Sequence, residues 1–173
     1  MIRLFVALDL PEDVRDRLPP PGGDWRAVPR ESLHVTLAFL GSRPEEDAAV
    51  AAQAVAGALA PVGEMATARA IVLPPRRPRV MAVELEDPSR GCVALQAGVA
   101  GALAAAGLYE PERRRWLPHV TIGRARGPAA GGGALPAVPR VEFRPPSVSL
   151  YRSHLGRGPA RYAALASFEL PPG

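Results

Sequence analysis

The chain has 173 residues, 47% of them hydrophobic and 22% charged, which is the composition of a folded protein rather than a disordered one. A chain of this length buries a substantial core, so a small scaffold that depends on disulfides or metal ions is excluded. The 21 basic residues exceed the 17 acidic residues by four, and no apolar run reaches the ~20 residues of a membrane-spanning helix.

The first half of the chain predicts strands that alternate with helices. Pro11 and the acidic residues after it suit the first turn of a helix, and Pro44 opens an alanine-rich helix that Pro61 ends. Runs of β-branched and apolar residues predict the strands. The expected elements are a strand over residues 4–8, a helix over 11–18, a strand over 33–40, a helix over 44–60 and a strand over 66–73.

The second half predicts the same alternation. Leu95, Val99 and Leu103 recur every four residues, so they form the apolar side of a helix that is capped by Asp87-Pro88 and ends at Gly107. The expected strands cover residues 79–85, 119–124, 148–155 and 162–170, and the last two are joined by a hairpin turn at 156–159.

The two halves repeat one order of elements: a strand, a helix, and then a strand that begins with His-Val-Thr. Val6 precedes His34 by 28 residues and Val83 precedes His119 by 36, which we interpret as a diverged internal duplication. The strands of each half bury an apolar face only if helices pack against it. We therefore expect a two-lobed α+β protein whose matching strands face each other across a cleft.

Each repeat presents one imidazole and one hydroxyl to the same surface. Residues i and i+2 of a strand face the same side, so His34 projects together with Thr36, and His119 with Thr121. A lone histidine on a strand is most often structural. Two HxT motifs at equivalent positions, in a chain with three histidines, instead indicate a functional pair.

Two imidazoles and two hydroxyls favour general acid–base catalysis over metal or covalent catalysis. A hydrolytic zinc site needs three protein ligands, and neither motif has the spacing or the nearby acidic ligand of such a site, so we expect no metal and no other cofactor. No nucleophilic serine elbow is present, and the single cysteine, Cys92, is expected in the core. Near pH 7 one histidine can accept a proton while the other donates one.

Paired proton transfers across one phosphorus atom are the chemistry of phosphodiester cleavage, and threonine hydroxyls can donate hydrogen bonds to the non-bridging oxygens. Without a metal to activate the leaving group, we expect a reactive substrate such as a strained 2′,3′-cyclic phosphate. Residues 1–75 have 7 Arg and 10 acidic residues, whereas residues 76–173 have 14 Arg and 7 acidic residues, and Lys is absent. Because Arg binds phosphate through two parallel hydrogen bonds, the basic second half is expected to hold RNA.

These motifs resemble those of the two-histidine (2H) phosphoesterase superfamily. Other stretches resemble the bacterial and archaeal RNA 2′,3′-cyclic phosphodiesterases, also called 2′-5′ RNA ligases; they are residues 3–8, 32–41, 149–153 and 161–162. The resemblance spans nearly the whole chain. It implies a single domain over residues 1–173, with two pseudo-symmetric, interleaved lobes. Each lobe would have a mostly antiparallel sheet flanked by helices, and the active-site cleft would lie between the lobes.

The resemblance also implies an activity: metal-independent hydrolysis of the 2′,3′-cyclic phosphate at an RNA end to a 2′-phosphomonoester. In that scheme His34 is the proton donor to the departing 3′ oxygen, and His119 is the proton acceptor from water. Thr36 and Thr121 lie beside them in the motifs. The reverse reaction would join RNA ends through a 2′-5′ linkage.

Three further side chains are candidates for substrate binding. Arg124, five residues after His119, is expected to contact phosphate, and Tyr151 to stack on or hydrogen-bond the terminal nucleotide. Arg161 is the third candidate. His154 has no Thr two residues on and is expected to be structural, and three consecutive arginines at residues 113–115 are expected to form a solvated surface patch.

The expected partners are RNA 3′ ends, and the protein is expected to be a cytoplasmic monomer without membrane contact. A small cyclic-phosphate nucleotide, such as ADP-ribose 1″,2″-cyclic phosphate, is the alternative substrate. Outside enzymes, the alternative is a non-catalytic RNA-end or nucleotide-binding protein in which the histidines only bind phosphate. The glycine-rich loop at residues 127–136 is predicted to be flexible, and its role in RNA binding stays open.

Overall fold

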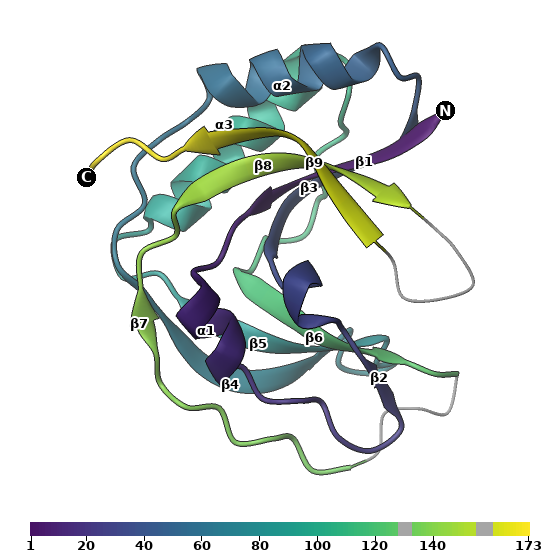
Figure 1. Ribbon diagram of the computed structural model, residues 1–173, viewed down its shortest axis with the longest axis vertical. Helices are drawn as coiled ribbons and strands as arrows, with labels where there is room; N and C mark the ends of the chain where they lie inside the picture. The colour runs from purple at the N-terminus through teal and green to yellow at the C-terminus, as the bar shows by residue number, and fades with distance from the viewer. Residues whose placement is uncertain (128–132, 155–160) are drawn as a thin grey trace.

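A computed structural model describes residues 1–127, 133–154 and 161–173 of the chain, and these residues form two antiparallel sheets (Figure 1). In sheet A the strand order is β3-β1-β8-β9, with bounds Val35–Arg43, Ile2–Leu8, Ser147–His154 and Arg161–Glu169. In sheet B the order is β2-β6-β5-β4-β7, with bounds Trp25–Ala27, His119–Ala125, Val80–Glu86, Met65–Leu73 and Glu142–Phe143. The predicted α+β fold with antiparallel sheets is confirmed.

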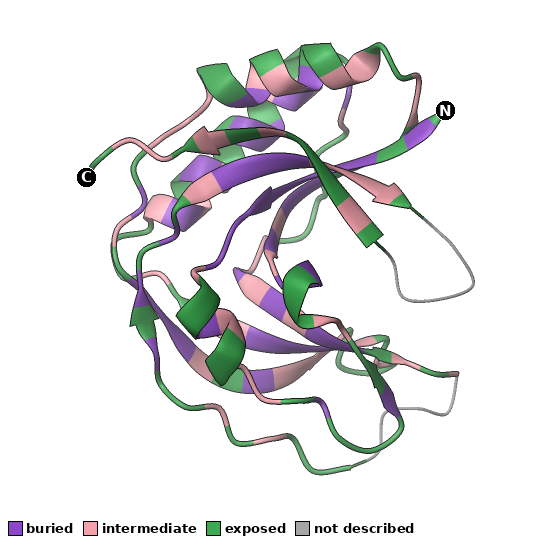
Figure 2. Ribbon diagram, viewed as in Figure 1, coloured by how far each residue is buried: buried purple, intermediate pink, exposed green. Residues whose placement is uncertain are grey.

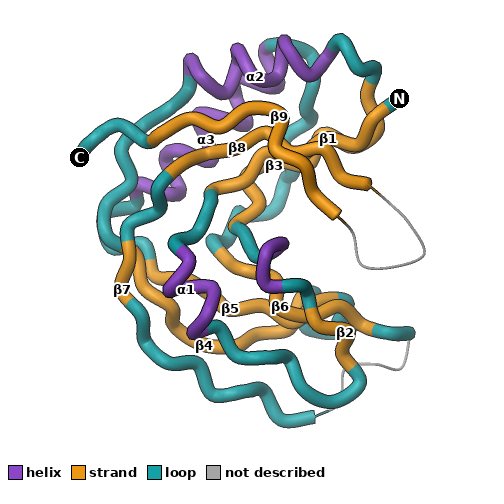
Figure 3. The backbone as a smooth tube through the Cα atoms, viewed as in Figure 1, coloured by secondary structure: helices purple, strands orange, loops and turns teal. Residues whose placement is uncertain are grey.

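Two longer helices cover sheet A on the side away from sheet B (Figures 1 and 3). They are α2 (Asp47–Gly57) and α3 (Gly91–Ala105), which pack on each other and contact strands β3, β8 and β9. The predicted apolar side of α3 is fully buried at Leu95, Val99 and Leu103, and Cys92 is buried beside them as expected for a core residue. Two short helical segments, α1 (Glu12–Arg17) and the 3₁₀ helix η1 (Arg30–Ser32), lie between β1 and β3 along the chain.

Strand β1 separates the hydrophobic core from a second face of sheet A. Its alternate residues Leu4, Val6 and Leu8 belong to the core cluster shared with the helices. The residue between them, Phe5, points to the opposite face, because successive side chains of a strand alternate. Figure 2 shows β1 buried along most of its length. The fold therefore places a buried strand directly behind the face on which the first HxT motif lies.

The two sheets exchange strands between the halves of the sequence. Strand β4 comes from the first half but lies in sheet B, and β8 and β9 come from the end of the chain but complete sheet A. In each half, the strand that precedes the helix pairs with the strand of the HxT motif: β1 with β3, and β5 with β6. This pairing agrees with the proposed duplication, and the assignment of residues 1–173 to a single domain stays a prediction.

Several details differ from the sequence prediction. The short strands β2 and β7 and the helix η1 were not predicted, because two or three residues are too few for a periodic pattern. Helix α3 begins at Gly91, and Asp87 caps it as predicted, because its carboxylate accepts a hydrogen bond from the backbone N–H of Val93 at 3.0 Å. The predicted turn at 156–159 and residues 128–132 of the glycine-rich loop lie outside the described residues. In the part of the chain that the structure describes, no helix is long and apolar enough to cross a bilayer.

The packing of α3 gives a matched pair of stability variants. Val99→Ala removes two methyl groups from a fully buried site, so we expect a loss of roughly 1–3 kcal/mol in the free energy of unfolding. Val50→Ala, in α2 at 45% exposure, should change it by less than about 0.5 kcal/mol. Denaturant unfolding of both variants measures the difference, and equal losses would contradict the assignment of Val99 to the core.

Candidate active site

The two HxT motifs occupy equivalent positions at the beginnings of β3 and β6. In the first motif Val35 is fully buried while His34 and Thr36 are half-buried, and in the second Val120 is fully buried while His119 and Thr121 are half-buried. The alternation predicted from the sequence is therefore present in both strands. In each motif the imidazole and the hydroxyl share the face that the core does not use.

The structure brings the two motifs together where the sheets meet. Strands β3 and β6 belong to different sheets and contact each other. Trp116, three residues before His119, donates a hydrogen bond from its indole Nε1 to the backbone oxygen of Thr36 at 3.2 Å. This bond links the segment leading into the second motif directly to the first motif.

Both histidine rings are oriented by the same interaction. Nδ1 of His34 lies 2.7 Å from the backbone oxygen of Ser32, and Nδ1 of His119 lies 2.7 Å from the backbone oxygen of Leu117. A carbonyl oxygen can only accept, so Nδ1 carries the proton in both rings. In a neutral ring Nε2 is then the proton acceptor, and Nε2 of His34 lies 3.0 Å from Oγ1 of Thr36. The pair is thus set up for proton transfer at Nε2.

The environment of His34 keeps its imidazole neutral. Burial lowers the pKa of His34 to about 4, and the positive charges of Arg124 and Arg15 contribute in the same direction. The hydrogen bond to Ser32 and the charge of Asp9 oppose this shift, but they are the smaller effects. Arg124, exposed on β6, is therefore close enough to act electrostatically on the histidine of the other motif.

An aromatic cluster surrounds His34 on the same face of sheet A. The ring centroid of Phe5 lies 4.9 Å from that of His34, 5.2 Å from Tyr151 and 4.8 Å from Tyr162. Phe5 also stacks on Phe39 at 5.5 Å, and Phe39 is 48% exposed. Sequence reasoning named only Tyr151 of these rings. The alternation along β1 was a usable signal for Phe5, because the burial of Leu4 and Val6 directs it to the other face.

A buried carboxylate holds Tyr151 in this cluster. Asp9 is 7% exposed and accepts hydrogen bonds from the hydroxyls of Tyr151 at 2.6 Å, Ser147 at 2.7 Å and Ser149 at 2.6 Å. Burial, followed by the interaction with Asp9, raises the pKa of Tyr151 to about 12. The tyrosine therefore stays protonated, and its hydroxyl is committed to Asp9 while its ring packs on Phe5.

The last predicted binding residue, Arg161, lies beside the cluster rather than in it. Arg161 is exposed at the start of β9 and pairs with His154, whereas the next residue, Tyr162, packs edge-on against His34 with centroids 5.4 Å apart. Neighbours on a strand face opposite sides, so Tyr162 is the side chain that β9 presents to His34. A role for Arg161 in substrate binding stays a prediction.

Sequence reasoning also missed Arg15, in α1. Within the described ranges, its Nε is buried and has no hydrogen-bond partner. Its positive charge contributes to the low pKa of His34 and opposes the rise in the pKa of Tyr151, so it lies near the aromatic cluster. A buried guanidinium nitrogen without a partner is costly unless an anion satisfies it. Arg15 thus joins Arg124 as a candidate to bind a phosphate group beside His34.

The comparisons with known proteins agree with this geometry. A family model described as the 2′-5′ RNA ligase superfamily matches residues 12–157. A Thermus thermophilus protein named RNA 2′,3′-cyclic phosphodiesterase is 33% identical, with 98% of this chain and 90% of the relative covered. An Escherichia coli protein of the same name is 30% identical, with 97% and 96% covered.

Two solved structures share the fold over 98% of both chains. A crystal structure titled as a phosphoesterase has a TM-score of 0.83 at 27% identity, and Escherichia coli LigT complexed with 3′-AMP has a TM-score of 0.80 at 26% identity. The family match covers most of the chain and includes both histidine motifs. This chain therefore belongs to the 2′-5′ RNA ligase superfamily.

Proposed function

We propose that this chain hydrolyses the 2′,3′-cyclic phosphate at RNA ends to a 2′-phosphomonoester. The names of the two curated relatives support the RNA cyclic phosphodiesterase activity expected from the sequence. The observation that supports it most directly is the equivalent orientation of the two imidazoles, each held through Nδ1 by the carbonyl two residues earlier. Such a pair can protonate one oxygen and deprotonate another across a single phosphorus atom.

In the proposed mechanism each histidine moves one proton. Nε2 of His119 takes a proton from water as the water oxygen forms its bond to phosphorus. The bond from phosphorus to O3′ breaks, and O3′ takes the proton from Nε2 of His34. Thr36 and Thr121 donate hydrogen bonds to the non-bridging oxygens, whose charge the guanidinium of Arg124 offsets. The product keeps the phosphate on O2′.

His34 must gain a proton before it can donate one. A pKa of about 4 leaves its ring neutral at pH 7 in the free protein. A bound cyclic phosphate brings a negative charge next to the ring, and a nearby opposite charge raises the pKa of an imidazole. Substrate binding therefore charges the acid, so that this half-buried ring becomes an imidazolium only when a phosphate compensates its charge.

The aromatic cluster supports placing the substrate's nucleoside on the sheet A side. The leaving O3′ belongs to the ribose of the terminal nucleotide, so this ribose lies against His34 in the proposed mechanism. The ring of Tyr162 lies against His34, and the half-exposed ring of Phe39 stacks on Phe5 on the same face. Unpaired bases bind to protein aromatic rings by stacking, which favours an RNA end over a duplex.

Single-histidine variants test the catalytic roles. His34→Ala or His119→Ala should lower the rate on an RNA that ends in a 2′,3′-cyclic phosphate by ~10² or more, because each removes one proton transfer. His154→Ala, the change at the third histidine, should keep the parent rate, and EDTA should change none of the rates. Phosphorus NMR of the product distinguishes the 2′- from the 3′-monophosphate. A parent protein without turnover would favour the non-catalytic alternative, and faster turnover of ADP-ribose 1″,2″-cyclic phosphate would favour the small-nucleotide alternative.

The charging of His34 by substrate predicts a shift in its titration. In NMR titrations of the free protein, the ring signals absent from His34→Gln should have a midpoint near pH 4, and the ring should be neutral above it. With saturating 3′-AMP, a nucleotide bound by Escherichia coli LigT, the midpoint should move upwards. A midpoint near 6.5 in the free protein would show that burial does not hold the ring neutral. An unchanged midpoint with nucleotide would contradict the charging step.

A further inference from the structure

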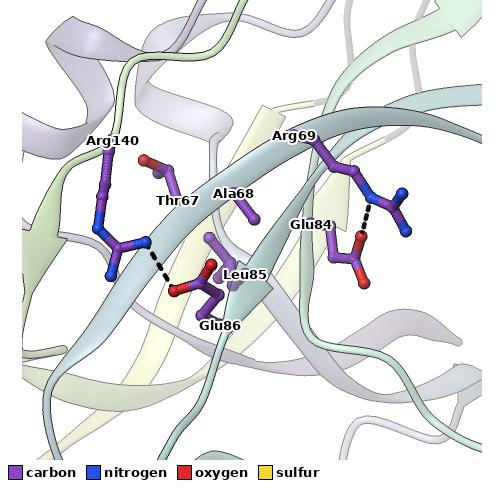
Figure 4. Close-up of a pocket in the computed structure, with 7 residues that line it drawn as sticks. All are labelled: Thr67, Ala68, Arg69, Glu84, Leu85, Glu86 and Arg140. Carbon is purple, nitrogen blue, oxygen red and sulfur yellow. Dashed lines mark hydrogen bonds and ion pairs between the residues drawn. The ribbon is translucent and has the colours of Figure 1, made fainter.

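A cavity of about 490 Å³ lies on sheet B, and none of its lining residues belongs to the aromatic cluster (Figure 4). It is lined by Thr67, Ala68 and Arg69 of β4, by Glu84, Leu85 and Glu86 of β5, and by Arg140. Ligand-binding cavities in proteins typically measure about 300–1,000 Å³, so it is large enough for a nucleoside. None of its lining residues has a part in the hydrolytic mechanism described above.

The strand register places this cavity beside His119. Glu84 of β5 pairs with His119 of β6, and on its other side Glu84 pairs with Arg69 of β4. Directly paired residues of antiparallel strands face the same side, with Cβ atoms about 4.5–5.5 Å apart. His119, Glu84 and Arg69 therefore form one row across three strands, and the cavity continues the face of sheet B on which His119 lies.

In the proposed mechanism this is the side from which the nucleophile attacks. His34 serves the leaving oxygen, and in an in-line displacement the attacking oxygen lies on the opposite side of phosphorus, at His119. Water needs no cavity of nucleoside size. A larger nucleophile, whose hydroxyl replaces water and whose remaining atoms need a place to bind, would use this space.

We propose that the cavity binds the 5′-terminal nucleoside of a second RNA strand that ends in a 5′-hydroxyl, which rests on the proposed function through the role of His119. The 5′-hydroxyl gives its proton to Nε2 of His119 as O5′ forms a bond to phosphorus. The bond from phosphorus to O3′ breaks, and O3′ takes the proton from His34. The product is a 2′-5′ phosphodiester, and no further reactant is needed.

The charges of the cavity match such a nucleoside better than they match a phosphate. Arg69 Nε donates to Glu84 Oε2 at 2.7 Å and Arg140 Nη1 to Glu86 Oε2 at 2.7 Å, so the four charges balance (Figure 4). A nucleoside with a free 5′-hydroxyl is uncharged, and its ribose hydroxyls and base amino groups are donors for the carboxylates. With its charges balanced in two ion pairs, the cavity offers no net positive charge to a phosphate.

Arg69 and the bulge before it shape the rim. Arg69 is bonded to Glu84 through Nε, and its side chain is 74% exposed; in the proposal its outer nitrogens bind the first phosphodiester after the nucleoside. The register of β4 shifts between Thr67 and Arg69, which leaves Ala68 as an extra residue. Bulges re-aim side chains, and here a small residue lies in the wall where a larger one would fill the cavity.

The test measures joining and hydrolysis in one reaction. An RNA that ends in a 2′,3′-cyclic phosphate is incubated with increasing amounts of a second RNA with a 5′-hydroxyl, and both products are quantified. In Arg69→Ala and Ala68→Phe the ratio of joined to hydrolysed product should fall about tenfold, the effect of losing about 1.4 kcal/mol of binding to the second strand. Hydrolysis in the absence of the second RNA should stay within about twofold of the parent.

Matched controls separate this effect from altered stability or charge. Arg77→Ala removes an exposed arginine from the loop after β4, and Ala163→Phe enlarges an exposed alanine on β9; both should keep the parent ratio. A parent that hydrolyses the RNA but forms no joined product at saturating second strand would overturn the acceptor site. Equal losses of joining and hydrolysis in Arg69→Ala and Ala68→Phe would also overturn it. A parent that does neither reaction would instead refute the proposed function.

Discussion

The hydrogen bond from Nδ1 of each histidine to the carbonyl two residues earlier is the constraint on which the site depends. It fixes one tautomer for His34 and for His119, at the same distance of 2.7 Å from Ser32 and from Leu117. If either ring were flipped, Nδ1 would face the substrate in place of Nε2. The backbone carbonyl would then lose its hydrogen bond and be left unsatisfied. Both carbonyls belong to segments that lead into a strand. The path of the backbone into each strand therefore fixes the orientation of each ring.

Equivalent rings nevertheless have different surroundings, and those of His34 disfavour the imidazolium that the proposed acid needs until a phosphate is bound. His34 is packed by Phe5 and Tyr162, with two arginine charges acting on it, so desolvation and repulsion disfavour its charged form. His119 pairs across the sheet with Glu84, a carboxylate already bonded to Arg69. The duplication supplied two similar motifs, and the packing around them differs because sheet A contributes aromatic rings where sheet B contributes charged pairs.

Local signals explain how much was predictable from the sequence. The alternation in His34–Leu37 and the four-residue spacing in α3 depend on neighbours along the chain, and both predictions are confirmed by the burial of these residues. The bond between Asp9 and Tyr151 joins residues 142 positions apart, and the exchange of strands between sheets is equally non-local. No period in the sequence encodes such pairings. The role of Arg15 could not be predicted for the same reason. In the sequence it is one arginine of a short polar helix, and only the structure shows that its Nε is buried.

The site around His34 is complete only once these non-local strand pairings have formed. Strand β1 is central in sheet A, between β3 and β8, so the face around His34 is complete only after the C-terminal strands have paired. Asp9 has its hydroxyl partners on β8, and the edge of Tyr162 comes from β9. Without these strands, Phe5 would be exposed and the carboxylate of Asp9 would regain water. Burial, the main cause of the low pKa of His34, would then be reduced. The first HxT motif therefore acquires its chemistry from the last strands of the chain.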